Sequence, residues 1–382
     1  MKTTIAVALF SLALSCASTT NADTFGSGAN SFNIEFVNIG NPGNAADTTG
    51  NPNPAGSVAY SYRMGKFDIS EQMIEKANTL GGLGITVAGV GADKPATYVS
   101  WNEAARFVDW LNTSQGFTPA YKFTTQPGDA GYSAVSNIAL WAPGDAGYNP
   151  ANLYRNSQAH YFLPSVDEWY KAAYYDPSKN GGTGGYWQYP TGSNSAPTPV
   201  ASGTAAGTAV YNQYGENAVP ADITLAGGLS PYGTMAQGGN VYQWEESASN
   251  SPSAARVLRG GVYSYNSSVL LSSFLTYSPP TPPGGHAVGF RVASVAEPSG
   301  LLGDFNTDGR VDAADYVVWR KELGTTYTQT DYDVWRAHFG QSAPGAGSGS
   351  GAIANSAVPE PTTLALLMFA AASWCLRRSR AA

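Results

Sequence analysis

The sequence predicts an α+β fold of short strands, a few helices and much irregular chain. Its 382 residues include 44 glycines and 24 prolines, and aromatic residues make up 12% of the total. Such a composition favours many turns and short strands packed around aromatic side chains. Charged residues make up another 12%, which is about half the usual share. We therefore do not expect long helices on the surface.

Charge and cysteine content exclude several classes of protein. The formal net charge is −7, without a basic patch or stripe in the sequence, whereas nucleic-acid binding requires one. The two cysteines, Cys16 and Cys375, both lie in terminal apolar segments. We therefore expect no nucleic-acid partner, and the body of the protein has neither a disulfide framework nor a thiol nucleophile.

The N-terminus has the pattern of a secretory signal peptide. Lys2 precedes an apolar run over residues 5–14, and small residues lead to Ala17 and Ala22. We predict that residues 1–22 form the signal peptide, with cleavage after Ala22. A lipoprotein signal at Cys16 is the alternative, although the three residues before it match that pattern weakly.

The C-terminus has a matching short apolar segment. Residues 358–361 read Val-Pro-Glu-Pro, an uncharged run follows over 362–376, and three arginines close it. As a helix this run spans roughly 22 Å, short of the ~30 Å hydrocarbon core. It is either a short tail anchor with its arginines in the cytoplasm or a sorting signal. Residues 358–382 resemble the PEP-CTERM sorting tail, which implies processing by an exosortase-type enzyme and an exported bacterial protein at the cell surface or in the matrix.

Two strands and two helices are predicted in the first half of the chain. Strands are expected over residues 32–39 and 60–69, from their apolar and partly alternating residues. Ser100 and Ser165 each begin a capping box, with glutamate three residues later. We predict that each starts an amphipathic helix lying on the surface, and that these are the only strong helices before residue 300.

Residues 178–230 are mostly small residues and tyrosine, and they predict loops and short strands. Three aromatic residues in this segment have two interpretations. Tyr186, Trp187 and Tyr189 stack on sugars if they are exposed, but core packing is the favoured interpretation.

Three glycine-anchored signatures follow at residues 238–244, 259–261 and 289–291. In each, glycine permits a tight bend or a close backbone approach, while an aromatic residue or arginine beside it supplies packing or planar donors. The signatures are therefore expected to fix the backbone shape of this region. Glu245 and Glu246 are adjacent and cannot face each other across a substrate on regular structure, so we predict a solvated turn for them.

Residues 304–315 have the spacing of a twelve-residue calcium loop. Acidic or amide side chains stand at positions 1, 3, 5, 9 and 12, and Gly309 permits the sharp turn between them. Calcium takes about six to eight oxygen ligands, and position 7 supplies a backbone carbonyl. The predicted ligands are Asp304, Asn306, Asp308, Arg310 through its carbonyl, Asp312 and Asp315. The alternative is a solvated acidic turn.

The segment after this loop contains an internal repeat. Residues 315–320 recur as residues 331–336, and in each copy the aromatic residues fall on one helical face. Residues 301–342 resemble a dockerin, a duplicated unit of calcium loop and helix that binds cohesins. Residues 325–330 have no acidic ladder, so a cohesin partner is in doubt. Residues 343–357 are a Gly/Ser/Ala linker to the sorting tail.

Six stretches of the large N-terminal region match, in order, the motifs of one enzyme family. They are residues 62–70, 99–104, 162–169, 239–244, 259–261 and 289–291. Residues 23–296 resemble a formylglycine-generating enzyme (sulfatase-modifying factor) domain. The resemblance implies a variant of the C-type lectin fold, with two helices, twisted antiparallel strands and much irregular chain.

The resemblance does not extend to the redox ligands of the family. The enzymes oxidise a substrate cysteine with copper held by two cysteines, and the matching positions here are Tyr265 and Leu270. Thiolates select Cu(I), and neither residue replaces them. Related iron enzymes use a histidine cluster, whereas His160, His286 and His338 are separated; the first two are expected to be surface or capping residues.

These observations favour a non-catalytic, exported protein whose lectin-like domain binds a glycan or a protein partner. Gln243 stands where the family's calcium loop has glutamate, so we expect Asn240 and Gln243 to form a hydrogen-bonded loop core rather than a metal site. The alternatives are a metal-dependent oxidoreductase with an unrecognised site, and a purely structural role in the matrix.

Overall fold

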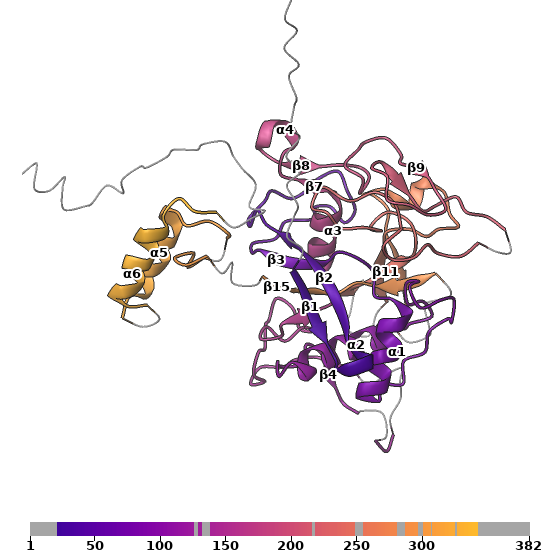
Figure 1. The fold of residues 1–382 in the computed structure, drawn as a ribbon, viewed down its shortest axis with the longest axis horizontal. Helices are drawn as coiled ribbons and strands as arrows, with labels where there is room; N and C mark the ends of the chain where they lie inside the picture. Colours follow the sequence, from indigo (N-terminus) through magenta and orange to yellow (C-terminus); the bar gives the residue numbers. More distant parts are fainter. Residues whose placement is uncertain are drawn as a thin grey trace, which may run out of the picture. The chain divides into compact units, whose positions relative to one another are not determined.

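The structure of the protein is a computed structural model, and its contacts divide the chain into two compact units, residues 1–296 and 297–382. It describes residues 21–125, 129–131, 138–215, 218–248, 255–280, 287–296, 301–306, 308–324 and 327–342. Figure 1 colours the large unit from indigo to orange and the small unit yellow. The linker, the sorting tail and nearly all of the signal peptide predicted from the sequence lie outside these residues.

The first sheet of the large unit joins its two ends. Its order is β1-β2-β3-β15-β6, and every pair in it is antiparallel. Figure 1 shows the N-terminal strands of this sheet in indigo beside β15 in orange. The strands are β1 (Asn21–Phe25), β2 (Phe32–Ile39), β3 (Tyr62–Gly65), β6 (Tyr161–Phe162) and β15 (Ala293–Val295).

The strand predicted over residues 32–39 is confirmed, and the strand predicted over residues 60–69 is shorter than expected. Only Tyr62–Gly65 is extended in the ladder. Past Gly65 the N–H of Lys66 still donates to Glu35 of β2, but its carbonyl accepts from the N–H of Met235, so the ladder ends there.

The second sheet brings the three glycine signatures onto one rung. Its order is β13-β12-β11-β14, and Gln243 on β11 lies opposite Arg259 on one side and Gly289 on the other. A Cβ atom at Gly289 would lie 2.7 Å from the carbonyl oxygen of Ala96, which explains the glycine. The strands are β11 (Tyr242–Ala248), β12 (Arg256–Arg259), β13 (Thr276–Ser278) and β14 (Val288–Phe290).

Both predicted helices are present with their capping boxes. Helix α2 (Trp101–Ser114) begins at Ser100, and helix α3 (Val166–Tyr174) begins at Ser165. The prediction that they lie on the surface is wrong, because even polar side chains such as Arg106 and Asn112 of α2 are buried. Both side chains donate to carbonyls of other segments: Nη1 of Arg106 to Leu83 and the amide of Asn112 to Tyr161.

A third helix, α1 (Glu71–Gly81), was not predicted. Ser70 caps its N-terminus by accepting from the N–H of Met73, and Gly82 ends it in the left-handed conformation with φ of 61°. Ser70 and Gly82 are the sequence signals for this helix. They were missed because the residue three after the cap is Met73, so no capping box marks its start.

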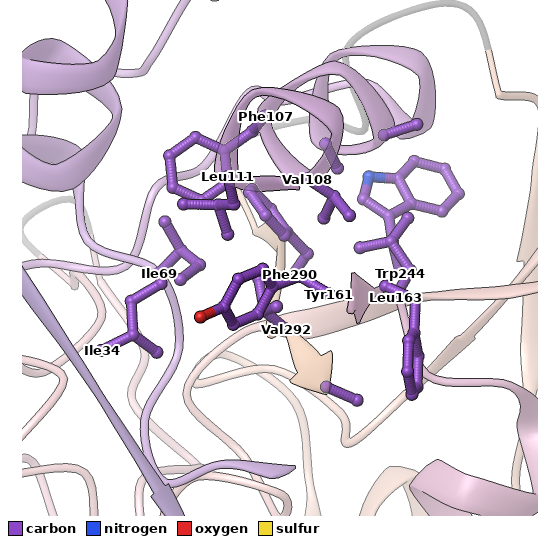
Figure 2. Packing of buried hydrophobic residues seen from close by; sticks show 14 of the residues in the cluster. Ile34, Ile69, Phe107, Val108, Leu111, Tyr161, Leu163, Trp244, Phe290 and Val292 are labelled. Atoms are coloured by element: carbon purple, nitrogen blue, oxygen red, sulfur yellow. The ribbon is translucent and has the colours of Figure 1, made fainter. Parts of the chain in front are cut away.

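The main core lies between helix α2 and the two sheets. Phe107, Val108 and Leu111 of α2 meet Phe290 and Val292, as Figure 2 shows. The rings of Phe107 and Phe290 meet edge to face, with centroids 5.6 Å apart. This packing fixes the segment 289–291 between the sheet and the helix.

The rest of the large unit is made of loops and two-residue ladders, as predicted for residues 178–230. The α+β prediction, with short strands and much irregular chain, is confirmed. The remaining elements are η1 (Gly28–Asn30), β4 (Lys122–Phe123), β5 (Ile138–Ala139), β7 (Tyr175–Asp176), α4 (Lys179–Gly182), β8 (Gly185–Tyr186), β9 (Thr198–Pro199), β10 (Thr208–Ala209) and η2 (Ser267–Leu270).

The small unit is a pair of helices, α5 (Ala313–Glu322) and α6 (Gln329–His338). Both helices have capping boxes, which begin at Asp312 and Thr328. In the part of the chain that the structure describes, no helix has the length and apolar character needed to cross a membrane.

The two helices of the small unit exchange equivalent hydrogen bonds. The indole N–H of Trp319 donates to the carbonyl of Thr328, and that of Trp335 donates to the carbonyl of Asp312, each at 2.8 Å. Each tryptophan therefore binds the capping residue of the other helix. Tyr316 and Tyr332 complete a cluster of four aromatic rings between the helices.

Candidate functional site

The rung where the three signatures meet is a buried polar network centred on Gln243. The Gln243 carbonyl accepts from the indole N–H of Trp169 and from Nε of Arg291, both at 2.7 Å. Its amide donates to Asp68 at 2.7 Å and to the carbonyl of Ala236 at 2.8 Å. The side chain thus uses both donors and both acceptor positions within the protein, which is the hydrogen-bonded loop core expected from the sequence.

Asp68 is the acidic member of this network, and the nearby donors offset the negative charge of its carboxylate only in part. Arg291 donates at 2.7 Å to the carbonyls of Gly65 and Met235, but lies 3.3 Å from Oδ1 of Asp68. Oδ2 of Asp68 is buried without a hydrogen-bond partner. Burial raises the pKa of Asp68 to about 7, although Arg291 and Asn240 act to lower it.

The prediction of a solvated turn at Glu245 and Glu246 is wrong. Both residues lie on strand β11 and are buried. Glu245 lies 3.3 Å from Nε of Arg259, and burial raises its pKa well above the usual value while Arg259 opposes the shift. Each carboxylate lies beside an arginine from another segment, Arg259 for Glu245 and Arg155 for Glu246, which the local sequence does not reveal.

Glu246 belongs to a second network, which is organised by Arg155. The Arg155 guanidinium lies 2.8 Å from Glu246 and 2.7 Å from Glu168, and it stacks on the ring of Phe162 at 3.7 Å. Burial alone would raise the pKa of Glu168, but the charge and hydrogen bonds of Arg155 lower it overall. Tyr121 also donates to Glu246, at 3.0 Å. One arginine thus holds two buried carboxylates from α3 and β11.

Sequence reasoning assigned no role to Arg155 or Asp68. Arg155 lies in a loop without a motif, and no local pattern marks it. Asp68 lies inside the matched stretch 62–70, so its position was available but its burial was not.

The two positions that hold copper in the enzymes of the resembled family have no metal-binding character here. Tyr265 is 54% exposed, and Leu270 is fully buried at the end of η2. A phenol on the surface and an aliphatic side chain in the core do not form a soft two-ligand site. The residues present do not fit copper.

Tyr265 instead belongs to an exposed tyrosine surface, which we define as Tyr214 and Tyr265. Their side chains are 69% and 54% exposed. Asn212 joins them, because its N–H donates to the carbonyl of Tyr265 and its side chain accepts from the Tyr214 hydroxyl, both at 2.8 Å. The ring of Tyr242 supports Tyr265 edge to face at 6.4 Å.

The other aromatic candidates have packing partners within the protein, which agrees with the packing interpretation favoured from the sequence, although Tyr186 and Trp187 are only half-buried. Tyr189 is buried, and Tyr186 packs against Tyr170 and Tyr175. The indole N–H of Trp187 donates to Asp176 at 3.0 Å. These contacts give each of the three side chains a partner within the protein.

The histidines are dispersed. His160 is half-buried, and its ring stacks on Phe117 with centroids 4.3 Å apart. His338 lies in α6, with Nδ1 2.8 Å from the carbonyl of Val334. His286 lies outside the described residues.

In the small unit, the predicted calcium loop folds around its own side chains. The Asp304 carboxylate accepts from the N–H groups of Asp308, at 3.1 Å, and Gly309, at 2.9 Å. Asp308 accepts from the N–H of Arg310 at 2.9 Å. Gly309 has φ of 84°, a left-handed conformation that glycine adopts without strain.

Asp315 closes the loop from its far end. Its two carboxylate oxygens accept from the N–H groups of Asn306, at 3.0 Å, and Asp312, at 2.8 Å. Burial raises the pKa of Asp315, backbone hydrogen bonds lower it, and the charge of Asp304 raises it. The five side chains among the six predicted ligands therefore lie in one loop, and their oxygens and the carbonyl of Arg310 suit calcium chemically.

Among the residues that the structure describes, no group of three or more His, Cys, Asp or Glu side chains is arranged to hold a metal ion. Several loop oxygens accept backbone N–H groups instead.

Comparisons with known proteins identify two parts of the chain. The family described as sulfatase-modifying factor enzyme 1-like domain matches residues 43–296, and the PEP-CTERM protein-sorting motif matches residues 357–380. A motif of this kind marks an exported protein with a C-terminal sorting tail. No curated protein matches the chain significantly.

Solved structures with a similar chain course include three proteins of low sequence identity. Treponema denticola variable protein 1 is 17% identical, covering 73% of this chain and 100% of its own, with a TM-score of 0.49. CarF is 18% identical, covering 69% and 99%, with a TM-score of 0.44. PvdO from Pseudomonas aeruginosa is 14% identical, covering 72% and 98%, with a TM-score of 0.41.

The family match covers more than half of the chain. It spans all three glycine signatures and the network around Gln243. The protein therefore belongs to the family of sulfatase-modifying factor enzyme 1-like domains.

Proposed function

We propose that the protein is a non-catalytic member of its family, exported to the cell surface or matrix, whose large unit binds a glycan or a protein. The observation that carries this proposal is the chemistry of the two redox positions, where Tyr265 is exposed and Leu270 is buried. The family scaffold is kept while the thiolates that its oxidation chemistry needs are replaced.

The tyrosine surface supports a glycan as the ligand. A sugar ring has a face of C–H groups that packs on an aromatic ring, and hydroxyls that need hydrogen-bond partners. Tyr214 and Tyr265 offer exposed rings, and Asn212 between them carries an amide. The support of Tyr265 by Tyr242 reduces the ordering cost of binding.

The test is a glycan and peptide array probed with the purified chain, with and without calcium. Tyr265→Ala and Tyr214→Ala are expected to lose binding to whichever ligand the parent captures. Tyr277→Ala is the matched control, because Tyr277 is 48% exposed but lies on β13 outside the tyrosine surface.

Two results contradict this proposal. One is stoichiometric copper or iron in the purified protein, which favours the metal-dependent oxidoreductase instead. The other is ligand capture that survives both substitutions. A chain that binds nothing on the array favours the purely structural role.

The sorting motif supports processing by an exosortase-type enzyme after export. The short apolar run over residues 362–376 would hold the chain transiently in the membrane before processing. Mass spectrometry of the chain recovered from the cell surface tests this, because processing removes the terminal arginines. Recovery of the intact C-terminus contradicts it.

We further propose that the small unit is a dockerin-like module with one calcium site. Asp304, Asn306, Asp308, Asp312 and Asp315 would hold the ion with the carbonyl of Arg310. The folded loop and its oxygen ligands support this, and calcium would offset the excess of four aspartates over one arginine in the loop. The second repeat has no acidic ladder, so the proposal does not extend to a cohesin partner.

A further inference from the structure

Strand β1 contains the bond at which the sequence predicts the end of the signal peptide. The strand spans Asn21–Phe25, so cleavage after Ala22 falls between its second and third residues. In the antiparallel pair with β2, Ala22 lies opposite Glu35 and Asp23 lies opposite Ile34. The folded large unit therefore includes two residues that the predicted cleavage would remove.

Asp23 attaches this strand to the interior of the first sheet. Its carboxylate lies 3.0 Å from Nη1 and 2.7 Å from Nη2 of Arg63, and it accepts from the hydroxyl of Tyr161 at 2.8 Å. The Arg63 side chain is only 1% exposed, and it stacks on the ring of Phe36 at 4.6 Å. Two strands from distant parts of the chain, β3 and β6, thus hold one carboxylate of the edge strand.

Cleavage after Ala22 would change the charge at this position. It would give Asp23 a free α-amino group, and such groups have a pKa of about 7.7–8.0 in peptides, so most would be protonated at neutral pH. The ammonium would stand on the same residue as the carboxylate that neutralises Arg63. It would compete for that carboxylate and repel the guanidinium, and solvent screens a buried charge only weakly. A peptide bond before Asp23 avoids both effects.

A second bond with small residues before it lies upstream. Ser15 and Ala17 stand at the third and first positions before the bond that follows Ala17, which is the small-residue pattern of a cleavage site. The apolar run ends at Leu14, three residues before this bond but eight residues before the bond after Ala22. Cleavage after Ala17 also leaves three residues ahead of β1.

We propose that the signal peptide comprises residues 1–17 and that the mature chain begins at Ser18, with Asn21 and Ala22 retained in β1. Hydrolysis of the bond between Ala17 and Ser18 consumes one water molecule. It leaves a carboxylate on the released leader and an α-ammonium on Ser18, five residues before Asp23. The proposal rests on the proposed export of the chain and is independent of the ligand of the large unit.

The experiment determines the N-terminus of the full chain after export by a bacterial host, using mass spectrometry of the exported fraction. The expected first residue is Ser18. A start at Asp23 would overturn the proposal and leave export intact, whereas a chain that keeps Met1 would contradict the export signal as well. A lipid-modified start at Cys16 would also overturn it, because the chain would then be a lipoprotein.

Two matched variants distinguish the two bonds, because Ala17→Leu and Ala22→Leu each place a large residue directly before one of them. Ala22→Leu is expected to be processed to Ser18 like the parent, and Ala22 is exposed on β1, so the fold tolerates the change. Ala17→Leu is expected to lose the Ser18 start and to yield the precursor or a start at Asp23. The opposite pattern, or parental processing of Ala17→Leu, would overturn the proposal.

The structural reason is tested with chains that begin at Ser18 or at Asp23, each released from a cleavable N-terminal fusion. We expect the chain that begins at Asp23 to unfold at a temperature about 2–4 °C lower. Acetylation of its α-amino group should recover part of this loss, because it removes the charge at Asp23 but does not restore the missing residues of β1. Equal unfolding temperatures of the two chains would overturn the proposal, since β1 would then not need the residues before Asp23.

Discussion

The two units of the protein handle their acidic residues differently. In the large unit, buried carboxylates lie beside buried arginines: Glu168 and Glu246 beside Arg155, and Glu245 beside Arg259. In the small unit, the acidic side chains of residues 304–315 accept mostly backbone N–H groups. One unit contains its own counter-charges, and the other gathers negative charge on a single loop.

This difference explains why only one unit is a candidate for a structural cation. A buried acid beside an arginine gains a counter-charge and hydrogen bonds from the protein itself. An acidic loop that relies on backbone dipoles is stabilised further by an ion. The large unit is therefore expected to fold without added metal, while the small unit is expected to respond to calcium.

The largest expected effect comes from removing a counter-charge in the large unit. Arg155→Met leaves Glu168 and Glu246 buried without their shared cation, and we expect a loss of about 3–5 kcal/mol in the free energy of unfolding. Urea unfolding followed by tryptophan fluorescence measures it. Lys94→Met is the control, because its pair with Asp222 is partly exposed. Equal losses in both variants would show that burial of the pair is unimportant.

The next effect is a pH dependence of stability caused by Asp68. The pKa of Asp68 is raised to about 7 in the folded protein, against about 3.9 in the unfolded chain. Between these values the folded state holds a proton that the unfolded state has lost, so stability falls as the pH rises from about 4 to about 7 and then levels off. The contribution of this residue is at most about 4 kcal/mol.

The comparison of the parent with Asp68→Asn across pH isolates this contribution. Asparagine does not titrate, so the stability difference between the two proteins should change over the same pH range and be constant above it. Denaturant titrations at a series of pH values provide the measurement. A pH-independent difference would mean that Asp68 titrates normally.

Calcium should act on the small unit alone. At about 100-fold excess over the dissociation constant, it should add ~2.7 kcal/mol to the stability of that unit, with a dissociation constant of about 10⁻⁴–10⁻³ M. Asp308→Ala should abolish the calcium-induced gain in helicity, measured by circular dichroism and titration calorimetry. Asp333→Ala, an exposed aspartate on α6, should titrate like the parent; a normal titration by Asp308→Ala would refute the ligand assignment.

The smallest effect tests the symmetry inside the small unit. Trp319→Phe and Trp335→Phe each remove one indole hydrogen bond to the cap of the other helix, and each should lower stability by about 1 kcal/mol without calcium. With calcium, Trp335→Phe should have the larger effect, because its partner Asp312 lies in the loop. Thermal unfolding followed by near-UV circular dichroism measures both; equal losses with calcium would show that the loop and α6 are uncoupled.

Part of the candidate site was predictable from local sequence. The stretch 238–244 was expected to fix backbone shape with Gln243 hydrogen-bonded inside it, and this is what the structure shows. The prediction succeeded because glycine and amide groups at fixed spacing have few alternative arrangements. Arg155 and Asp68 were not predictable in their roles, since their partners come from distant segments.

The sequence by itself determined the local signals of this protein. Capping boxes at Ser100 and Ser165 start helices where the sequence predicted them, because the bonds involved connect residues three apart. The strand over residues 32–39, the family and the sorting motif were likewise present in the sequence.

Only the tertiary structure decided which of these elements are buried. Helix α2 was expected on the surface and Glu245 and Glu246 in a solvated turn, yet the fold encloses all three. Burial of a polar side chain depends on a partner that arrives from elsewhere in the chain, as Arg259 does for Glu245 and Leu83 for Arg106. No local pattern encodes that partner, so the charge networks emerge only when the segments are packed together.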